Sequence, residues 1–211
     1  MFKELSNKLN NFLQENYSEF VNYPFNKDLY VLGGTIRDVM LDKKPKDVDF
    51  LFFDNEAEMF KFLDDTKIKY ALNSFGTPKI DYNGKMVDMM SKQNPYNLLM
   101  YNVDGLFYNC TKSKFMLLGF ENFAETRSLK LLYGDSGHPN PARTLERQVK
   151  LRKFTRELKE RHLFEEIENS FVTENDMFEE NPFYIDKGLL DENQDIASDL
   201  DIDSLDNDMV E

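Results

Sequence analysis

The segment LYVLGGTIRDVMLDKKPKDVDFLFF, residues 29–53, decides the fold of this chain. Its apolar start, Leu29–Leu32, is typical of a buried strand, and the Gly-Gly pair that follows ends that strand. Residues 35–42 then predict a short helix, and Asp47–Phe53 predict a second strand. A strand, a helix and a strand in such close succession indicate a mixed α/β sheet.

Further elements on both sides of this segment complete the domain. Apolar residues at helical spacing predict an amphipathic N-terminal helix within residues 1–26, and residues 55–64 predict another helix. Two apolar runs, 78–82 and 85–90, flank an Asn-Gly dipeptide, which is the strongest short signal of a β-hairpin. We therefore expect an α/β (α+β) domain over residues 27–137, with a mixed sheet flanked by helices.

The net charge of −13 lies almost entirely at the end of the chain. Residues 170–211 contain 14 of the 39 acidic residues and one of the 26 basic residues, so the first 169 residues carry 25 of each sign. Such an acidic segment buries too little apolar surface to offset the entropy of ordering, and we expect a disordered tail. The neutral body is compatible with a nucleic-acid partner, which a uniformly acidic protein would not be.

A strongly basic segment, residues 138–169, connects the domain to the tail. Between residues 140 and 162 it has eight basic residues against three acidic ones, with an apolar stripe at helical spacing. Taken alone, such a helix is typical of a solvated surface. Because it follows a candidate nucleotide site in the sequence, it predicts contact with an RNA backbone or with a triphosphate.

Several features indicate a cytoplasmic protein without a membrane partner. No apolar run approaches the roughly 20 residues that span a bilayer, and the N-terminus lacks the pattern of a signal peptide. The single cysteine, Cys110, cannot form an internal disulfide, and we expect it to be a packing residue. The two histidines, His138 and His162, are expected to be surface or structural residues.

The glycine pair Gly33-Gly34 is a candidate phosphate site. Two glycines let backbone amides approach a phosphate closely, and the helix N-terminus behind them favours anions. Arg37, in the first turn of this helix, adds a guanidinium that donates to phosphate oxygens. By itself, this pattern is also typical of a tight strand-to-helix turn.

Three acidic residues on two predicted strands are candidate metal ligands. Asp47 and Asp49 are two positions apart in a strand, so their carboxylates share one face and repel each other unless a cation neutralises them. Their neighbours are strongly apolar, which favours a central buried strand over a solvated edge strand. Asp88, the only acid in the second run of the hairpin, completes a set that Mg²⁺ binds in two-metal phosphoryl transfer.

Together these motifs resemble the head domain of the CCA-adding enzymes and bacterial poly(A) polymerases, which belong to the DNA polymerase beta-like nucleotidyltransferase superfamily. That family has an apolar strand, then Gly-Gly-x-x-Arg-Asp, and shortly afterwards Asp-x-Asp. Residues 31–38 and 47–50 match this order and spacing closely. Two weaker matches are VDGLFY (103–108), which is similar to Ile-Asn-Ala-Leu-Ala-Tyr, and NPAR (140–143), which is similar to Asp-Pro-x-Arg.

The resemblance implies a site and a reaction. Asp47 and Asp49 would hold Mg²⁺, and with Asp88 they form the expected catalytic site for two Mg²⁺ ions. The 3′-hydroxyl of an RNA, such as a tRNA, would attack the α-phosphorus of ATP or CTP, and pyrophosphate would leave. The residues expected to bind the nucleotide are Gly33, Gly34, Arg37, Asp38, Arg143, Arg147 and Lys150.

The chain departs from the family pattern in three places. The family's Arg-Arg-Asp falls on Leu98–Met100, and Glu146 stands in the place of a second arginine, with Arg147 and Lys150 close by as substitutes. The chain also ends soon after the basic helix, where family members continue into helical domains that hold tRNA. We therefore expect a second copy of the chain or a partner protein to supply the RNA-holding surface.

Two other functions stay open on the sequence. A nucleotidyltransferase that modifies a protein or a small molecule is favoured by the short C-terminal region. A degenerate module that binds RNA or a nucleotide without catalysis is favoured by the altered residues Leu98–Met100.

Overall fold

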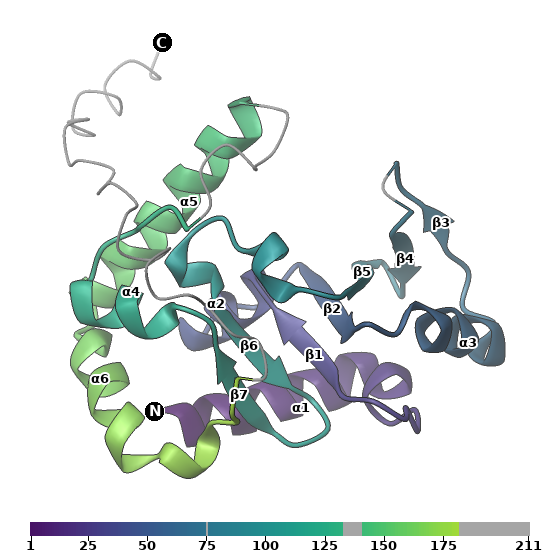
Figure 1. The fold of residues 1–211 in the computed structure, drawn as a ribbon, viewed down its shortest axis with the longest axis horizontal. Helices are drawn as coiled ribbons and strands as arrows, with labels where there is room; N and C mark the ends of the chain where they lie inside the picture. Colours follow the sequence, from purple (N-terminus) through teal and green to yellow (C-terminus); the bar gives the residue numbers. More distant parts are fainter. Residues whose placement is uncertain (75, 133–140, 182–211) are drawn as a thin grey trace.

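The computed structural model describes residues 1–74, 76–132 and 141–181. Seven strands in these residues form one sheet, in the order β3-β4-β5-β2-β1-β6-β7 (Figure 1). Strand β2 runs parallel to β5, and the other pairs of the sheet are antiparallel. The strands are β1 (Leu29–Leu32), β2 (Asp47–Phe53), β3 (Ala71–Leu72), β4 (Pro78–Tyr82), β5 (Lys85–Lys92), β6 (Leu106–Asn109) and β7 (Lys114–Leu117).

Helices pack around this sheet, so the predicted fold class, a mixed sheet flanked by helices, is confirmed (Figure 1). The predicted helices at 1–26, 35–42 and 55–64 correspond to α1, α2 and α3, and the basic helix corresponds to α5. The α-helices are α1 (Phe2–Val21), α2 (Gly34–Met40), α3 (Glu56–Thr66), α4 (Phe120–Thr126), α5 (Pro141–Glu160) and α6 (Leu163–Thr173). Short 3-10 helices are η1 (Pro95–Leu98), η2 (Asn102–Asp104) and η3 (Asn175–Met177).

The predicted hairpin is confirmed as β4 and β5. Both turn residues, Asn83 and Gly84, have positive φ angles, 55° and 76°, which a tight two-residue turn of this kind requires. Sequence patterns did not predict β3, β6, β7 or α4. Strands β6 and β7 extend the sheet on the far side of β1.

Strand β2 lies in the middle of the sheet, as its apolar residues predict, and divides its side chains between two core clusters. Val48, Phe50 and Phe52 belong to the larger cluster, which helices α1 to α6 supply with apolar side chains. The ring of Phe50 stacks on Phe20 of α1, with 5.2 Å between ring centroids. Leu51 faces the opposite side and belongs to the smaller cluster. Both faces of β2 are therefore buried beyond its first residues.

The C-terminal segment differs from the tail that was expected to begin at residue 170. Helix α6 continues to Thr173, and Phe171 and Phe178 lie beside the ring of Phe2, at 5.7 and 4.9 Å between centroids. Glu174 accepts a hydrogen bond from the N-terminal amine at 2.7 Å. These aromatic residues bury enough surface to hold the segment on the body, in spite of its acidic charge. The remainder of the expected tail, 182–211, lies outside the described residues.

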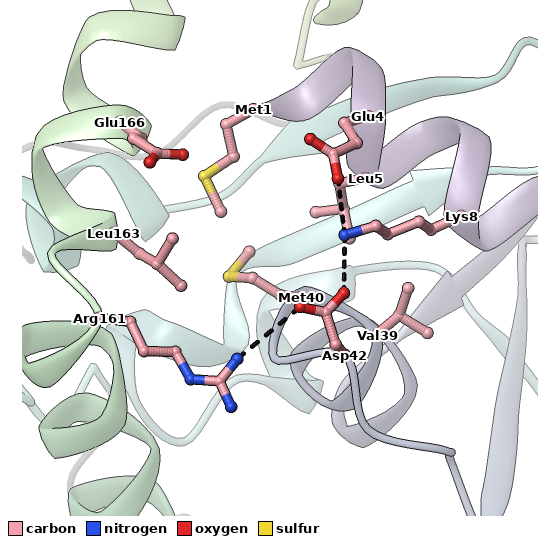
Figure 2. Close-up of a pocket in the computed structure, with 10 residues that line it drawn as sticks. All are labelled: Met1, Glu4, Leu5, Lys8, Val39, Met40, Asp42, Arg161, Leu163 and Glu166. Carbon is pink, nitrogen blue, oxygen red and sulfur yellow. Dashed lines mark hydrogen bonds and ion pairs between the residues drawn. The ribbon is translucent and has the colours of Figure 1, made fainter.

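A small cavity opens where α1, the end of α2 and the start of α6 meet (Figure 2). Its charged lining consists of Glu4, Lys8, Asp42, Arg161 and Glu166. A second cavity lies next to it, between α1 and the residues that follow α2. None of the predicted catalytic or nucleotide-binding residues lines either cavity, so both lie apart from the candidate site.

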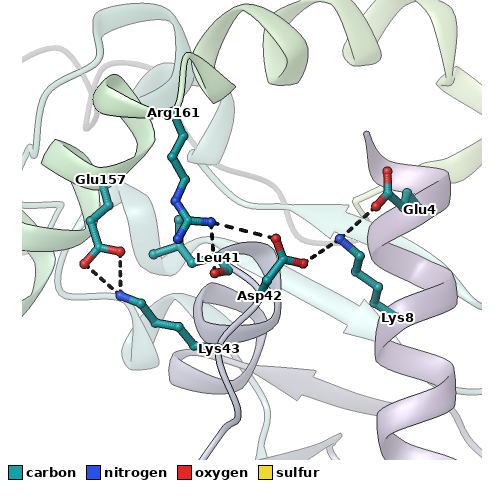
Figure 3. A network of polar contacts seen from close by, with 7 residues as sticks. All are labelled: Glu4, Lys8, Leu41, Asp42, Lys43, Glu157 and Arg161. Carbon is teal, nitrogen blue, oxygen red and sulfur yellow. Dashed lines mark hydrogen bonds and ion pairs between the residues drawn. The ribbon is translucent and has the colours of Figure 1, made fainter.

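Ion pairs beside this cavity hold α5 against α1 and α2 (Figure 3). Lys8 of α1 pairs with Asp42 at 2.7 Å, and Arg161, just after α5, lies 3.8 Å from the same carboxylate. Lys43 pairs with Glu157 of α5 at 2.5 Å. Each exposed pair contributes at most about 1 kcal/mol, but together they restrict the orientation of the basic helix. In the part of the chain that the structure describes, we find no helix of sufficient length and apolarity to cross a membrane.

Truncation of Phe50 tests the central position of β2. Phe50→Ala is expected to lower the free energy of unfolding by about 3–5 kcal/mol, because it leaves a void beside Phe20 in a core that cannot fully collapse. Urea denaturation measures this loss. The matched control is Val172→Ala on α6, where the side chain is 80% exposed and the expected change is within about 0.5 kcal/mol. Similar losses in both variants would contradict the assigned core.

Candidate functional site

The three predicted acidic residues come together at one end of β2. Asp47 and Asp49 project from the same face of β2, two positions apart. Asp88 of β5 is the register partner of Asp49 in the parallel pair. Asp47 is exposed, whereas Asp49 and Asp88 are half-buried. The sheet therefore places two carboxylates side by side and a third at the rim.

Electrostatic repulsion within this group is visible at Asp49. The pKa of Asp49 is raised from 3.8 to about 6. Burial is the largest cause, and the negative charges of Asp88 and Asp47 are the next two. Arg37 and Arg147 act in the opposite direction but do not cancel the effect. The site therefore has an excess of negative charge that a bound cation would relieve.

Gly33 fits closely against this carboxylate group. Its φ angle is +69°, a conformation that favours glycine, and a Cβ atom there would lie 3.4 Å from Oδ2 of Asp49. The hydroxyl of Thr35, two residues after Gly33, donates a hydrogen bond to the carbonyl oxygen of Asp47 at 3.1 Å. Gly34 has free space around it, so the structure gives no steric reason for a glycine there. Helix α2 is only seven residues long, so its dipole contributes little to anion binding.

Arg37 contacts a residue that the sequence did not single out. Its Nη1 donates to Oδ1 of Asp104 at 3.0 Å, and Nη2 of Arg147 lies 3.0 Å from the same oxygen. Asp104 lies in η2 and is 3% exposed. In the sequence it belongs to the VDGLFY match, where an acid inside an apolar segment is a usable signal. Arg37 and Arg147, predicted as nucleotide-binding residues, are thus held together by one buried carboxylate.

The other residues predicted to bind the nucleotide are Asp38, Lys150 and Arg143. Asp38 is half-buried on α2, and burial raises its pKa, partly opposed by the charges of Arg37 and Lys43. Lys150 is exposed on α5. Arg143 belongs to α5, but its side chain lies outside the described part.

Lys79 is a second residue that sequence patterns missed. It pairs in register with Asp88 from β4, and its Nζ lies 3.7 Å from Oδ1 of Asp88. That oxygen is buried and makes no hydrogen bond to any described residue. A half-exposed ammonium at this distance neutralises Asp88 only in part.

The segment that replaces the family's Arg-Arg-Asp is part of the core. Leu99 is 3% exposed and, with Tyr96 of η1, belongs to the smaller core cluster, against which Leu98 also packs. These side chains cover the face of the sheet to which Leu51 points. The substitution of apolar residues for charged ones is therefore a packing change, and these positions offer no polar group to a nucleotide.

The donor set fits a hard cation, although no complete cluster is preformed. In the described residues, no group of three or more His, Cys, Asp or Glu side chains is close enough to hold a metal. Two observations nevertheless favour a cation at Asp49 and Asp88: the unsatisfied buried Oδ1 of Asp88 and the close fit of Gly33 against Asp49. Carboxylate oxygens are the ligands that Mg²⁺ prefers.

Comparison with known proteins identifies the region that carries this site. Residues 29–93 match the family model of the Poly A polymerase head domain. The predicted family resemblance is confirmed. The matched residues run from β1 to the end of β5 and include Gly33, Arg37 and all three carboxylates, whereas Asp104 and Arg147 lie beyond them.

Several solved structures are similar to the chain at low identity. A CCA-adding enzyme from Thermotoga maritima, complexed with tRNA, is 19% identical over 64% of this chain and 35% of its own, with a TM-score of 0.46. A CCA-adding enzyme with CTP is 19% identical over 65% and 35%, with a TM-score of 0.45. A tRNA nucleotidyltransferase with a primer tRNA and an ATP analog is 13% identical over 55% and 38%, with a TM-score of 0.44.

The chain spans little more than a third of the length of these three proteins. No curated protein matches it.

Neutralisation of Asp49 should stabilise the metal-free protein at neutral pH. Because folding raises the pKa of Asp49 from 3.8 to about 6, the folded protein binds more protons than the unfolded chain between these values. Stability contributed by this group is therefore lost as the pH rises through that window. Asp49→Asn removes the loss, so we expect a gain of roughly 1–3 kcal/mol at pH 7 and little change below pH 4.

Urea denaturation of metal-free protein at both pH values measures this gain. Asp64→Asn, which removes a carboxylate at an exposed position of α3, is the matched control and should change the free energy of unfolding by no more than about 0.5 kcal/mol. An equal effect of Asp49→Asn at both pH values would contradict the raised pKa of Asp49.

Proposed function

We propose that this chain is a template-independent nucleotidyltransferase that transfers a nucleotide from ATP or CTP to the 3′ end of an RNA such as tRNA. The observation that carries the proposal is the register of β2 and β5, which sets Asp49 beside Asp88 within the residues that match the head domain. Gly33, between β1 and α2, lies against Asp49, and the charge of Arg37 from α2 acts on the same carboxylate.

The reaction requires no nucleophilic side chain. The 3′-hydroxyl oxygen of the acceptor gives up its proton to solvent and forms a bond to the α-phosphorus. The bond from the α-phosphorus to the bridging oxygen of the β-phosphate breaks, and pyrophosphate leaves. Positioning and charge stabilisation are then the contribution of the protein. Cys110 supports this view, because burial raises the pKa of its thiol and disfavours a thiolate.

In this proposal Asp47, Asp49 and Asp88 hold Mg²⁺, with two ions in the complete site. Bound there, Mg²⁺ would supply the positive charge that activates the attacking hydroxyl and stabilises the leaving pyrophosphate. Asp49 and Asp88 present oxygens from adjacent strands, and Asp47 adds one from the exposed rim. Arg37 and Arg147 supply guanidinium groups for the phosphate oxygens on the side of α2 and α5.

The RNA acceptor is proposed to lie along α5. Lys150, Lys153 and Arg156 are exposed on this helix, so they are available to phosphate groups. Leu145 and Val149, one turn apart, are 58% and 60% exposed among them. Such an uncovered apolar pair supports a second copy of the chain or a partner protein as the source of further RNA-holding surface, in the cytoplasm.

A non-catalytic module that binds RNA or a nucleotide is the second candidate. The contact of Lys79 with Asp88 favours it, because an ammonium group near the third carboxylate replaces part of the charge that a metal ion would bring. A transferase that labels a protein or small molecule instead of RNA is the third candidate, and the same assay distinguishes all three.

The assay follows label from each α-labelled nucleoside triphosphate into macromolecules of a cell extract. With Mg²⁺, we expect labelled RNA, and Asp49→Ala should reduce the labelling at least about a hundredfold because the central ligand is lost. Asp64→Ala is the matched control and should retain activity. Label on protein would support the third candidate. Absence of label from every fraction, with retained nucleotide binding, would support the binding module.

Charge reversal on α5 tests the acceptor surface. The double variant Lys150→Glu and Lys153→Glu is expected to weaken RNA binding at least about tenfold and to flatten its dependence on salt concentration, because fewer counterions are released. Lys27→Glu with Lys69→Glu makes the same change of charge at exposed positions away from α5 and should have a much smaller effect. Equal losses in both double variants would reduce the role of α5 to overall charge.

A further inference from the structure

One buried carboxylate connects three parts of the chain beside the candidate site. Asp104 in η2 receives Nη1 of Arg37 from α2 and Nη2 of Arg147 from α5, both at 3.0 Å and both on Oδ1. Its other oxygen, Oδ2, accepts the backbone N–H of Tyr101 at 3.2 Å. Both oxygens of this nearly inaccessible side chain are thus engaged, and its rotamer is fixed.

The backbone around Asp104 is also held firmly. Asn102 is completely buried, and its amide group donates to Asn122 at 3.2 Å and to the carbonyl oxygen of Ser128 at 3.1 Å. Gly105 packs so tightly that a Cβ atom there would collide with the carbonyl oxygen of Leu118. An anchor of this rigidity can define the position of other side chains to the precision that ligand recognition needs.

The two arginines need such an anchor because they repel each other. Burial lowers the pKa of Arg37, and the charge of Arg147 lowers it further, while Asp104 acts in the opposite direction. Two guanidinium groups and one carboxylate leave a net charge of one positive unit. Both guanidinium groups also act on Asp49, so they lie within electrostatic reach of the carboxylate group.

Arg147 retains an unused donor at this place. Its Nε is buried and has no hydrogen-bond partner among the described residues. A buried donor without a partner is unfavourable, and an anionic acceptor would remove that penalty. Planar guanidinium groups match the spacing of phosphate oxygens and bind them in a forked geometry.

We infer that Asp104 is a positioning residue: it holds Arg37 and Arg147 side by side so that their remaining N–H donors bind the polyphosphate of the nucleotide. The inference rests on the proposed function for its ligand class, a nucleoside triphosphate. Asp104 itself does not touch the nucleotide and acts through the two arginines. The alternative role is simple neutralisation of two partly buried cations.

Binding of inorganic tripolyphosphate in Mg²⁺ buffer, measured by calorimetry on the full chain, separates these roles. Asp104→Asn removes a negative charge, so neutralisation alone predicts tighter anion binding, whereas positioning predicts binding about tenfold weaker. Asp104→Glu keeps the charge but displaces it, so neutralisation predicts no change and positioning again predicts weaker binding. Wild-type or tighter affinity in both variants would overturn the inference.

Arg147→Lys tests the same connection without a change at the buried position. Its side chain is 40% exposed, so the variant should fold, and it keeps the charge while losing the planar fork. We expect weaker tripolyphosphate binding in this variant too. In the double variant with Asp104→Asn, the fold-loss of affinity should be smaller than the product of the two single losses. A purely multiplicative combination would count against action through Arg147.

Asp42→Asn is the matched control, because it removes a carboxylate that pairs with Arg161 and Lys8 away from the site. Its affinity should stay within about twofold of wild type, and thermal unfolding verifies that every variant is folded. Weak binding by the Asp104 variants without nucleotide transfer by wild type would refute the proposed function but retain the inference. Nucleotide transfer by wild type, with unchanged affinity in the Asp104 variants, would support the proposed function and refute the inference.

Discussion

The parallel pairing of β2 with β5 is the constraint on which the rest of the candidate site depends. Antiparallel neighbours can be joined by a tight turn, but a parallel pair needs a crossing connection. Here α3, β3 and β4 form that connection and return the chain so that Asp88 lies in register with Asp49. The same arrangement brings Lys79 of β4 beside Asp88. A shift of one residue in this register would turn Asp88 to the opposite face of the sheet and separate it from Asp49.

Charge balance at this end of the sheet explains why several partly buried ions can coexist. Burial raises the pKa of Asp49, the charges of Asp88 and Asp47 add to the rise, and the two arginines beyond them offset part of it. Asp104 in turn makes it possible for those arginines to lie together. Removal of one member of such a network leaves another charge uncompensated, so the effects of substitutions here should not be additive.

The position of α5 is set by contacts near both of its ends. Glu157 of α5 and Arg161, just after it, connect the C-terminal end of this helix to the residues after α2 (Figure 3). Arg147 connects its N-terminal part to η2. The basic helix is therefore attached at two places along its length. These contacts hold the helix, with its exposed lysines, beside α2 and η2.

The sequence by itself determined the local elements and the main motifs of the site. Gly33, Asp47 and Asp49 could be assigned because a strand, a glycine turn and alternation along β2 are local patterns, and Asn83-Gly84 fixed the hairpin. Strands β6 and β7 escaped prediction because each has four residues and no such turn signal between them. The partners of Asp104 and Lys79 were decided by tertiary structure alone. Contacts between residues 37, 104 and 147 depend on how the sheet, η2 and α5 pack, and no periodicity along the chain encodes that packing.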